Sequence, residues 1–277
     1  MRLVTWNCCR GPYLKKASFL EALAPDIAVI QECARPTWEN DQCLWFGHNP
    51  RQGIAVFARG SYRIRALPKV ARVPRYAIPV EVSGPTNFVL IAVWSKGGQA
   101  SPYVEGVVRA VKQYRKLFAQ CPTVLAGDLN SNTIWDSNHD QGLNHSALVK
   151  MLSELGLVSS YHFFHGEAHG EEKQPTYYFQ WKEQRPFHID YCFIPRIWAP
   201  NVQRVEIGSY AEWKSHSDHR PLLVEIADVA NCGTANPPLA LPPDQQRLHV
   251  APEDNWPARQ PSPKRSAPRR KSPDPAD

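Results

Sequence analysis

Five short polar clusters, each placed at the end of an apolar run, constrain this chain more than any other feature. Each run has the length and composition of a buried strand. Strands that lie side by side bring their ends together, so the clusters can meet although they are far apart in the sequence. Together they would form a pocket of carboxylates, amides and an imidazole, which suits a divalent cation and a phosphate ester. The clusters are Trp6-Asn7, Gln31-Glu32, Gly127-Asp128-Leu129-Asn130, His188-Ile189-Asp190 and Ser217-Asp218-His219.

Strand and helix patterns alternate as far as about residue 228 and indicate one domain of sheets layered with helices. Helices are predicted over Leu14–Leu23, Val104–Phe118 and Leu148–Leu155. The last of these has Asn144 or Ser146 as a plausible N-cap and Gly156 as its end. Strands are predicted at Leu3–Asn7, Ile27–Gln31, Gly53–Ala58, Ala77–Val82, Phe88–Val93, Thr123–Ala126, Ile189–Ile194 and Leu222–Ile226.

Length and composition limit the class of protein. The 277 residues, 43% of them hydrophobic, suffice for one sizeable core. The net charge of +6 is compatible with a polyanionic partner such as nucleic acid, although many proteins share this balance. No apolar stretch is long enough to span a membrane, and the first residues read as a strand rather than a signal peptide. Seven cysteines without CxxC spacing indicate reduced thiols and argue against zinc. We therefore expect a cytoplasmic protein. We also expect it to be a monomer.

The C-terminal segment from residue 231 to residue 277 differs from the rest of the chain. Eleven of the 26 prolines lie from Pro237 onward, and apolar residues become sparse. Such a segment buries too little apolar surface to offset the entropy of ordering. We therefore predict a disordered, Pro-rich basic tail. It serves either as a solubilising end or as an electrostatic tether to nucleic acid, and the interspersed acids favour the first role.

Carboxylates and amides stand where three of the apolar runs end. Asp128 and Asn130 are two residues apart, so in an extended segment they face the same side. A carboxylate there can take a proton from water, and an amide can hold a phosphate oxygen. Glu32 suits a hard cation such as Mg²⁺, and Asn7 can orient a metal-bound group. Taken singly, each of these clusters also fits an ordinary turn or strand end.

The last cluster contains the side chain that titrates nearest neutral pH. His219 can bind a phosphate or protonate a leaving group, and Asp190 can fix its tautomer by accepting from the other ring nitrogen. Pro221 follows and predicts an edge-like strand. A lone histidine here could also be a hydrogen-bonded core or surface residue. If the clusters did not share a site, their presence in this order would require five coincidences.

The ordered set resembles the motifs of the endonuclease/exonuclease/phosphatase superfamily, the fold of exonuclease III, deoxyribonuclease I and the inositol polyphosphate 5-phosphatases. The resemblance covers roughly residues 2–228. It implies an α+β fold, a four-layer α/β sandwich in which two packed mixed β-sheets are flanked by helices. It also implies hydrolysis of phosphate esters with Mg²⁺ or Mn²⁺. We accordingly expect the domain to span residues 1–230.

The resemblance implies a metal site at the ends of the first two strands. Glu32 would be the principal ligand, Asn7 would sit beside it, and Asp218 would complete the metal's surroundings. Nuclease members often carry Asp or another polar group two residues after the asparagine. This chain has Cys9 there, and a thiol is a poor ligand for Mg²⁺, so a second-metal role at that position is in doubt.

The catalytic residues that the resemblance implies are four. Asp128 would orient or deprotonate the attacking water, and Asn130 would hold that water and a phosphate oxygen. Asp190 would pair with His219, which would stabilise the charge that develops on the phosphoryl oxygens.

Three further residues are implied at the substrate. Tyr177 lies in a Thr-aromatic segment that helps to wall the pocket in relatives. Trp94 stands where many members place His or Tyr, and because it cannot act as an acid it weakens an abasic-endonuclease assignment. His188 either touches phosphate or packs beside a neighbouring ring.

A loop rich in histidine and glutamate lies outside the motif set. Its interspersed charges favour a solvated, mobile loop over a metal site. The residues are His162, His165, His169, Glu167, Glu171 and Glu172.

Three functions remain open from the sequence. A divalent-metal nuclease acting on DNA or RNA is favoured by the motif set, the basic balance and the aromatic segment. A phosphatase of small phosphate esters or inositol phosphates on the same scaffold is favoured by the departure at Trp94. A non-catalytic binding protein would need a broken site, and the motif residues are all present.

Overall fold

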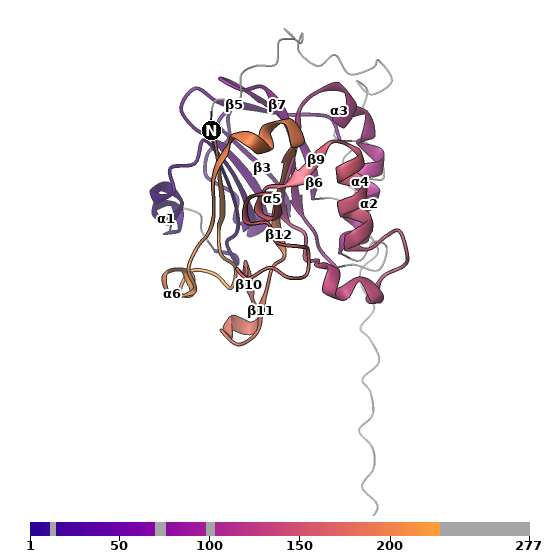
Figure 1. Ribbon diagram of the computed structural model, residues 1–277. Coiled ribbons are helices and arrows are strands. Elements are labelled where there is room, and N and C mark those ends of the chain that lie inside the picture. The colour runs from indigo at the N-terminus through magenta and orange to yellow at the C-terminus, as the bar shows by residue number, and fades with distance from the viewer. Residues whose placement is uncertain (12–14, 70–75, 98–102, 228–277) are drawn as a thin grey trace, which may run out of the picture. The chain divides into compact units, whose positions relative to one another are not determined.

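Two six-stranded mixed sheets pack face to face, with helices on their outer faces (Figure 1). The computed structural model describes residues 1–11, 15–69, 76–97 and 103–227. The strands of the first sheet, in spatial order, are β13 (Val202–Ile207), β14 (Leu222–Ile226), β1 (Arg2–Asn7), β2 (Ile27–Cys33), β4 (Gln52–Ala58) and β3 (Cys43–Asn49). Those of the second are β5 (Arg63–Ala66), β6 (Ala77–Ser83), β7 (Phe88–Trp94), β8 (Thr123–Asp128), β12 (Asp190–Pro195) and β9 (Leu157–Ser159).

Three apolar clusters hold the layers together. The largest fills the space between the sheets, where alternate residues of both inner faces meet. The second joins the outer face of the second sheet to α2 (Val104–Gln113), α3 (Arg115–Gln120) and α4 (His145–Glu154). The third covers the outer face of the first sheet with α1 (Ala17–Ala22) and α6 (Tyr210–Trp213). The expected four-layer α/β sandwich is therefore confirmed.

Two smaller elements lie near the ends of the strands. The helix α5 (Ser160–His165) packs against β12 and β13. The strands β10 (Tyr177–Tyr178) and β11 (Pro186–Phe187) form a separate hairpin at the lower edge of the molecule in Figure 1.

All eight predicted strands are present, with ends that differ by a few residues. The strand after Pro221 is not an edge strand, because β14 lies between β13 and β1. Six strands were not predicted, namely β3, β5, β9, β10, β11 and β13. The predicted helix over 104–118 is divided at Tyr114, whose hydroxyl donates to the carbonyl oxygen of Ala77. The predicted N-cap Asn144 caps α4 by accepting from the backbone N–H of Ala147.

Several predictions lie wholly or partly outside the described residues. Residue 14, the first of the predicted N-terminal helix, is one of them, and α1 is shorter than predicted. The predicted tail and the predicted domain end at residue 230 also lie outside the described part of the chain.

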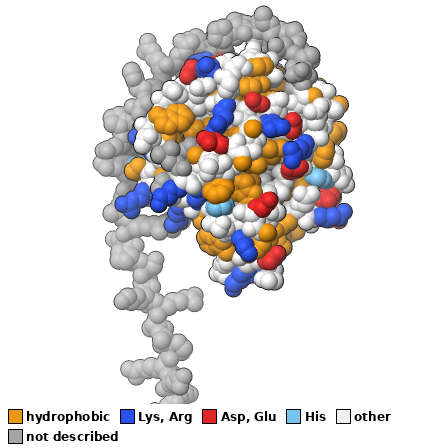
Figure 2. All heavy atoms as spheres, turned by 90° about the vertical axis from the view of Figure 1, so that its left-hand side faces the viewer, with side chains coloured by type: hydrophobic (Ala, Val, Ile, Leu, Met, Phe, Trp, Pro, Cys, Tyr) orange, Lys and Arg blue, Asp and Glu red, His pale blue; other side chains and the backbone are white. Residues whose placement is uncertain are grey.

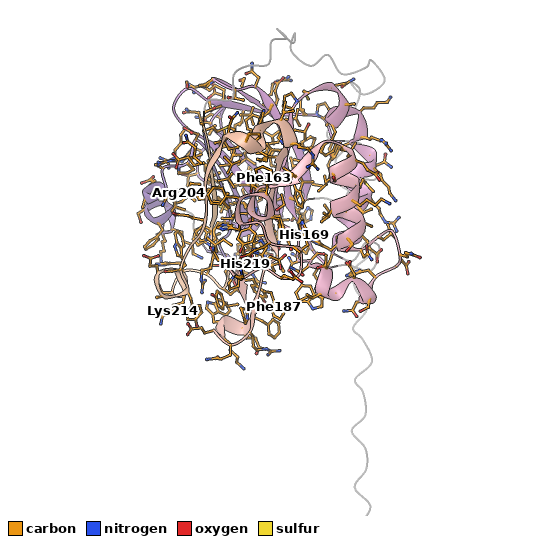
Figure 3. All side chains as sticks on the ribbon, in the orientation of Figure 1. Phe163, His169, Phe187, Arg204, Lys214 and His219 are labelled. Atoms are coloured by element: carbon orange, nitrogen blue, oxygen red, sulfur yellow. The ribbon has the colours of Figure 1, made fainter. Side chains whose placement is uncertain are left out.

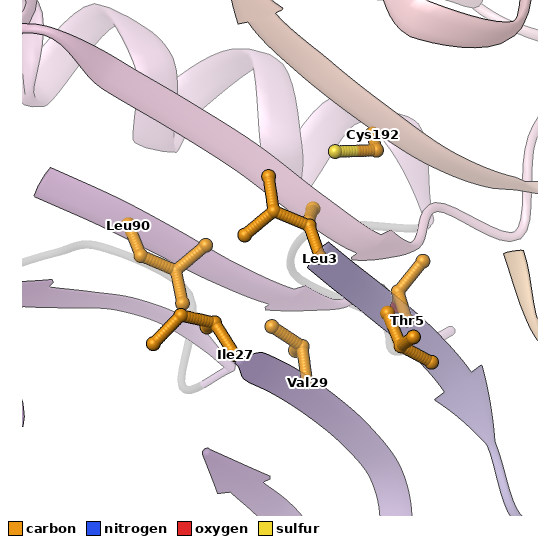
Figure 4. Close-up of a pocket in the computed structure, with 8 residues that line it drawn as sticks. Leu3, Thr5, Ile27, Val29, Leu90 and Cys192 are labelled. Carbon is orange, nitrogen blue, oxygen red and sulfur yellow. The ribbon is translucent and has the colours of Figure 1, made fainter. Parts of the chain in front are cut away.

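An enclosed void of about 10 Å³ lies between the two sheets (Figure 4). Side chains such as Leu3, Val29, Leu90 and Cys192 line it. It is barely large enough for one water molecule, and its walls are apolar, so it stays dry and holds no substrate.

Charged side chains of both signs share the surface. Over the centre and right of the face in Figure 2, Lys and Arg side chains are interspersed with Asp and Glu. Within the described part of the chain, no helix is long and apolar enough to cross a membrane.

Candidate active site

Two buried aspartates face each other where β8 meets β12. Asp128 and Asp190 are register partners in this antiparallel pair, and both side chains are fully buried. Gly127 allows β8 to approach β7 closely at this point. Its φ is +149°, and a Cβ atom there would lie 1.8 Å from the carbonyl oxygen of Val93. Glycine is therefore required beside the first aspartate.

A tight turn after β8 brings Asn130 back to Asp128. Asn130 has a left-handed φ of 45°, and its backbone N–H donates to Asp128 Oδ1 at 2.8 Å. Its side-chain Nδ2 donates to Asp128 Oδ2 at 2.8 Å and to the carbonyl oxygen of Ser95 at 2.9 Å. The two residues meet through this Asx-type turn rather than through an extended segment.

His219 pairs with the second aspartate. Its Nδ1 donates to Asp190 Oδ2 at 2.8 Å, which leaves Nε2 as the ring nitrogen not used in this pair. Thr176 anchors the backbone at Asp190. Its Oγ1 accepts from the backbone N–H groups of Ile189 and Asp190, both at 3.0 Å. In Figure 3, His219 lies above the hairpin that carries Phe187.

Asn7 joins the first sheet to the second. Its Nδ2 donates to Asp128 Oδ2 at 3.0 Å and lies 3.4 Å from Glu32 Oε1. Glu32 reaches this position because β2 is irregular there. The β2–β4 register shifts between Ile30 and Cys33, and Glu32 has a φ of 56°. A bulge of this kind re-aims a side chain, which explains why Gln31 stays buried while Glu32 points to the site.

Three residues that the motifs do not contain surround Glu32. Gln52 Nε2 donates to Glu32 Oε2 at 2.9 Å, and Arg10 Nε lies 3.4 Å from the same oxygen. Lys96 Nζ donates to Gln52 Oε1 at 3.4 Å. Of these, only Lys96 stands close to the end of a predicted strand, three residues after Val93.

Tyr177 and Asp218 complete the group. The ring of Tyr177 lies 4.5 Å from that of His219, and the two residues form an isolated β-bridge. Burial, followed by the charge of Asp218, raises the pKa of Tyr177 to about 12, so its phenol stays protonated. Burial raises the pKa of Cys9 to about 12 as well, and Asp218 adds to that rise by charge and by accepting from the thiol.

Two of the predicted substrate residues adjoin this group but are buried: Trp94 is the register partner of Asp128, and His188 lies two residues before Asp190. The Trp94 side chain is buried between the sheets, with its ring 4.8 Å from that of Tyr76. His188 is buried as well, and its Nδ1 donates to the carbonyl oxygen of Gln174 at 2.8 Å. Its ring packs 4.5 Å from that of Tyr161. A substrate role for Trp94 or His188 stays a prediction.

The aspartates and the histidine perturb one another. Burial is the main cause that raises the pKa of Asp128 to about 7, and the charge of Asp190 adds to it. Burial lowers the pKa of His219, but Asp190, Asp128 and Asp218 outweigh it and raise that pKa to about 9. At neutral pH the imidazole is therefore an imidazolium held between carboxylates.

The donors of this group fit a hard divalent cation. Oxygen atoms of Asp128 and Asp190 lie within 4.8 Å of each other. Asp190 Oδ1 is buried and has no hydrogen-bond partner. Glu32 adds a partly exposed carboxylate, tied to Asp128 through Asn7. Carboxylate-rich sets of this kind suit Mg²⁺ or Mn²⁺.

The histidine-rich segment is only partly solvated, and part of it is helical. Residues 160–165 form α5, and His162 is buried. The Glu172 side chain is only 4% exposed and pairs with His162 at 3.0 Å. Burial here arises from α4 and β12, which carry residues far from the loop in sequence, so the local pattern did not reveal it.

Comparison with solved structures shows what this fold is similar to. A 3′-5′ exonuclease (NExo) from Neisseria meningitidis is 19% identical, with a TM-score of 0.60 over 82% of this chain and 99% of that one. The endonuclease domain of TRAS1, a telomere-specific non-LTR retrotransposon, is 14% identical, with a TM-score of 0.59 over 82% and 98%. AP endonuclease LMAP from Leishmania major is 17% identical, with a TM-score of 0.61 over 80% and 86%.

No protein-family model matches the sequence, and no curated protein matches it. The structural likenesses establish that the chain has the fold of the endonuclease/exonuclease/phosphatase superfamily, as the motif order implied.

Proposed function

We propose that this protein is a divalent-metal-dependent phosphodiesterase, and that it acts as a nuclease on DNA or RNA. The observation that carries the proposal is the hydrogen-bonded group that joins both sheets. Asn7 reaches Asp128 and Glu32, and Asp190 holds His219 opposite Asp128. Structural neighbours that are described as an exonuclease and as endonucleases support nucleic acid as the substrate.

In this proposal, Glu32, Asn7 and Asp218 hold Mg²⁺ or Mn²⁺, which supplies Lewis acidity at a phosphoryl oxygen. Asp128 orients the attacking water, and Asn130 fixes that carboxylate through two hydrogen bonds. His219 presents its Nε2 to the phosphoryl oxygens, because Asp190 occupies Nδ1. The free thiols in the described residues support a reducing compartment such as the cytoplasm.

Cleavage assays on single-stranded, duplex, nicked and abasic DNA and on RNA test this function. We expect turnover with Mg²⁺ or Mn²⁺, none with chelator, and a loss of about 100-fold or more in Asp128→Asn and His219→Ala. His48→Ala, which removes an exposed histidine, is the control and should retain full activity. If no nucleic acid is cut, or if the site variants cut as well as wild type, the proposal is wrong.

A phosphomonoesterase is the second candidate. The same Neisseria protein is also described as a 3′ phosphatase bound to a product DNA hairpin. Phosphate release from 3′-phosphorylated DNA ends, nucleotides and inositol phosphates, measured with the same variants, separates this activity from cleavage of diesters.

A further inference from the structure

A second group of ligand-type side chains lies outside the proposed active site. His145 comes from α4, His162 from α5, and His169 and Glu172 from the segment that follows α5. One donor atom from each of His162, His169 and Glu172 lies within 4.8 Å of the other two. In Figure 3, His169 lies on the side of His219 that faces α4.

Glu172 is the centre of this group and is held in place by four hydrogen bonds. Asn132 Nδ2 lies 3.1 Å from both carboxylate oxygens, the backbone N–H of Gly170 donates to Oε2 at 3.0 Å, and His162 Nε2 lies 3.0 Å from Oε1. Among the described residues, its ion-pair partner is His162 rather than any Lys or Arg. A buried carboxylate without a permanent cation is costly, which makes this an unusual place for a merely structural glutamate.

The imidazoles carry partners on their outer nitrogens. His162 Nδ1 lies 2.7 Å from Ser159 Oγ, and His145 Nδ1 lies 3.0 Å from Ser131 Oγ. Without a metal, His162 Nε2–H donates to Glu172. Metal binding would release that proton, and Ser159 Oγ could then accept from Nδ1–H, which leaves Nε2 as the ligand nitrogen. His145 Nε2 contacts His169 Nδ1 at 3.3 Å and thereby orients that ring.

We propose that His162, His169 and Glu172 bind one transition-metal ion of the Zn²⁺ class, which fixes residues 166–176 behind the active site. Two imidazoles and a carboxylate form a set that selects such an ion over Mg²⁺, which prefers oxygen donors. The absence of CxxC spacing does not bear on this site, because it uses no thiolate. The rings of His162 and His169 stack at 3.5 Å and must tilt apart to converge on one ion.

The site adjoins the catalytic group through Asn132. The same Nδ2 that reaches Glu172 lies 3.0 Å from the carbonyl oxygen of His188 and 3.2 Å from the hydroxyl of Tyr191. His188 leads directly into Asp190. An ion that fixes Glu172 would therefore fix the entry of β12, although the binding proposal stands independently of the proposed nuclease activity.

The test titrates the full-length, chelator-stripped protein with Co²⁺ in the presence of excess Mg²⁺. The bound Co²⁺ is then displaced with Zn²⁺. We expect one tight equivalent with the visible absorption of tetrahedral Co²⁺. Glu172→Gln and His169→Ala should weaken binding by at least about 100-fold, since even outer-shell changes cost 10–100-fold. Glu32→Gln and His48→Ala should leave it unchanged.

Far-UV circular dichroism of each stripped variant shows which of them fold. Glu172→Gln keeps the shape of the side chain and decides the matter if His169→Ala does not fold. The proposal is overturned if saturating Co²⁺ gives no visible band, if Glu172→Gln binds as tightly as wild type, or if Glu32→Gln abolishes the tight equivalent.

Discussion

Replacing Thr176 by valine should destabilise the protein by removing one acceptor that serves two buried donors. Thr176 is fully buried, and its Oγ1 accepts from the backbone N–H groups of Ile189 and Asp190 at 3.0 Å each. Ile189 and Asp190 are themselves 2% and 0% exposed, so water cannot replace the hydroxyl. Valine has the same shape but offers no acceptor.

The expected cost follows from the two orphaned donors. Each buried group left without a partner costs about 1–3 kcal/mol, hence about 2–6 kcal/mol for the pair. The added methyl group offsets about 0.8 kcal/mol. A net loss near 3 kcal/mol lowers Tm by about 6–12 °C in a domain of this size.

Chemical and thermal denaturation of wild type, Thr176→Val and Thr176→Ser measure this cost. Serine keeps the oxygen and loses only a methyl group, for which we expect about 1 kcal/mol. Thr176→Val should also reduce the proposed phosphodiesterase activity, because Asp190 loses its backbone anchor. A valine variant as stable as the serine variant would refute the reasoning.

Three further predictions rest on single contacts. Gly127→Ala should cost more than about 3 kcal/mol, because its Cβ would meet the Val93 carbonyl. Gly142→Ala, which has open space around it and only the backbone strain of a φ of +85°, should cost less in the same denaturation assay. Burial lowers the pKa of His145 in the folded state to about 4, below its unfolded value of 6.5. The metal-stripped wild type should therefore lose stability relative to His145→Gln as pH falls from 6.5 to 4, by up to about 3 kcal/mol. A stability difference that does not change with pH would contradict this. Glu32→Gln should lower activity at least about 10-fold at limiting Mg²⁺, as a metal titration would show, and an unchanged titration curve would remove its role as a ligand.

The strand pattern made much of the fold predictable, because buried strands are apolar runs with polar ends. Those ends are also where Asn7, Asp128 and Asp190 stand, so their convergence followed once the strands were placed side by side. The pairing order was not readable from composition. As a result β14 was expected at an edge although it lies inside the sheet. The short or more polar strands β3, β5, β9, β10, β11 and β13 were not predicted at all.

Residues that act through tertiary contacts gave no local signal. Thr176 and Gln52 are ordinary polar residues in sequence, and their partners lie 14 and 20 residues away. The histidine-rich segment was misread for the same reason. Glu172 is buried by contacts with Asn132, forty residues earlier, which no local pattern encodes.

The charge balance of the active site favours a cation there. Asp190 and His219 form a pair that is close to neutral overall, because the raised pKa of the histidine keeps it protonated at neutral pH. The negative charge of Glu32 is paired with Arg10. Because the Arg10 side chain is 73% exposed, it compensates the charge of Glu32 only weakly. A phosphate ester brings further negative charge to a pocket that already holds carboxylates. In the proposed function, attraction of such a substrate requires positive charge beyond that of His219, which a divalent ion held by the oxygen donors around Glu32 would supply.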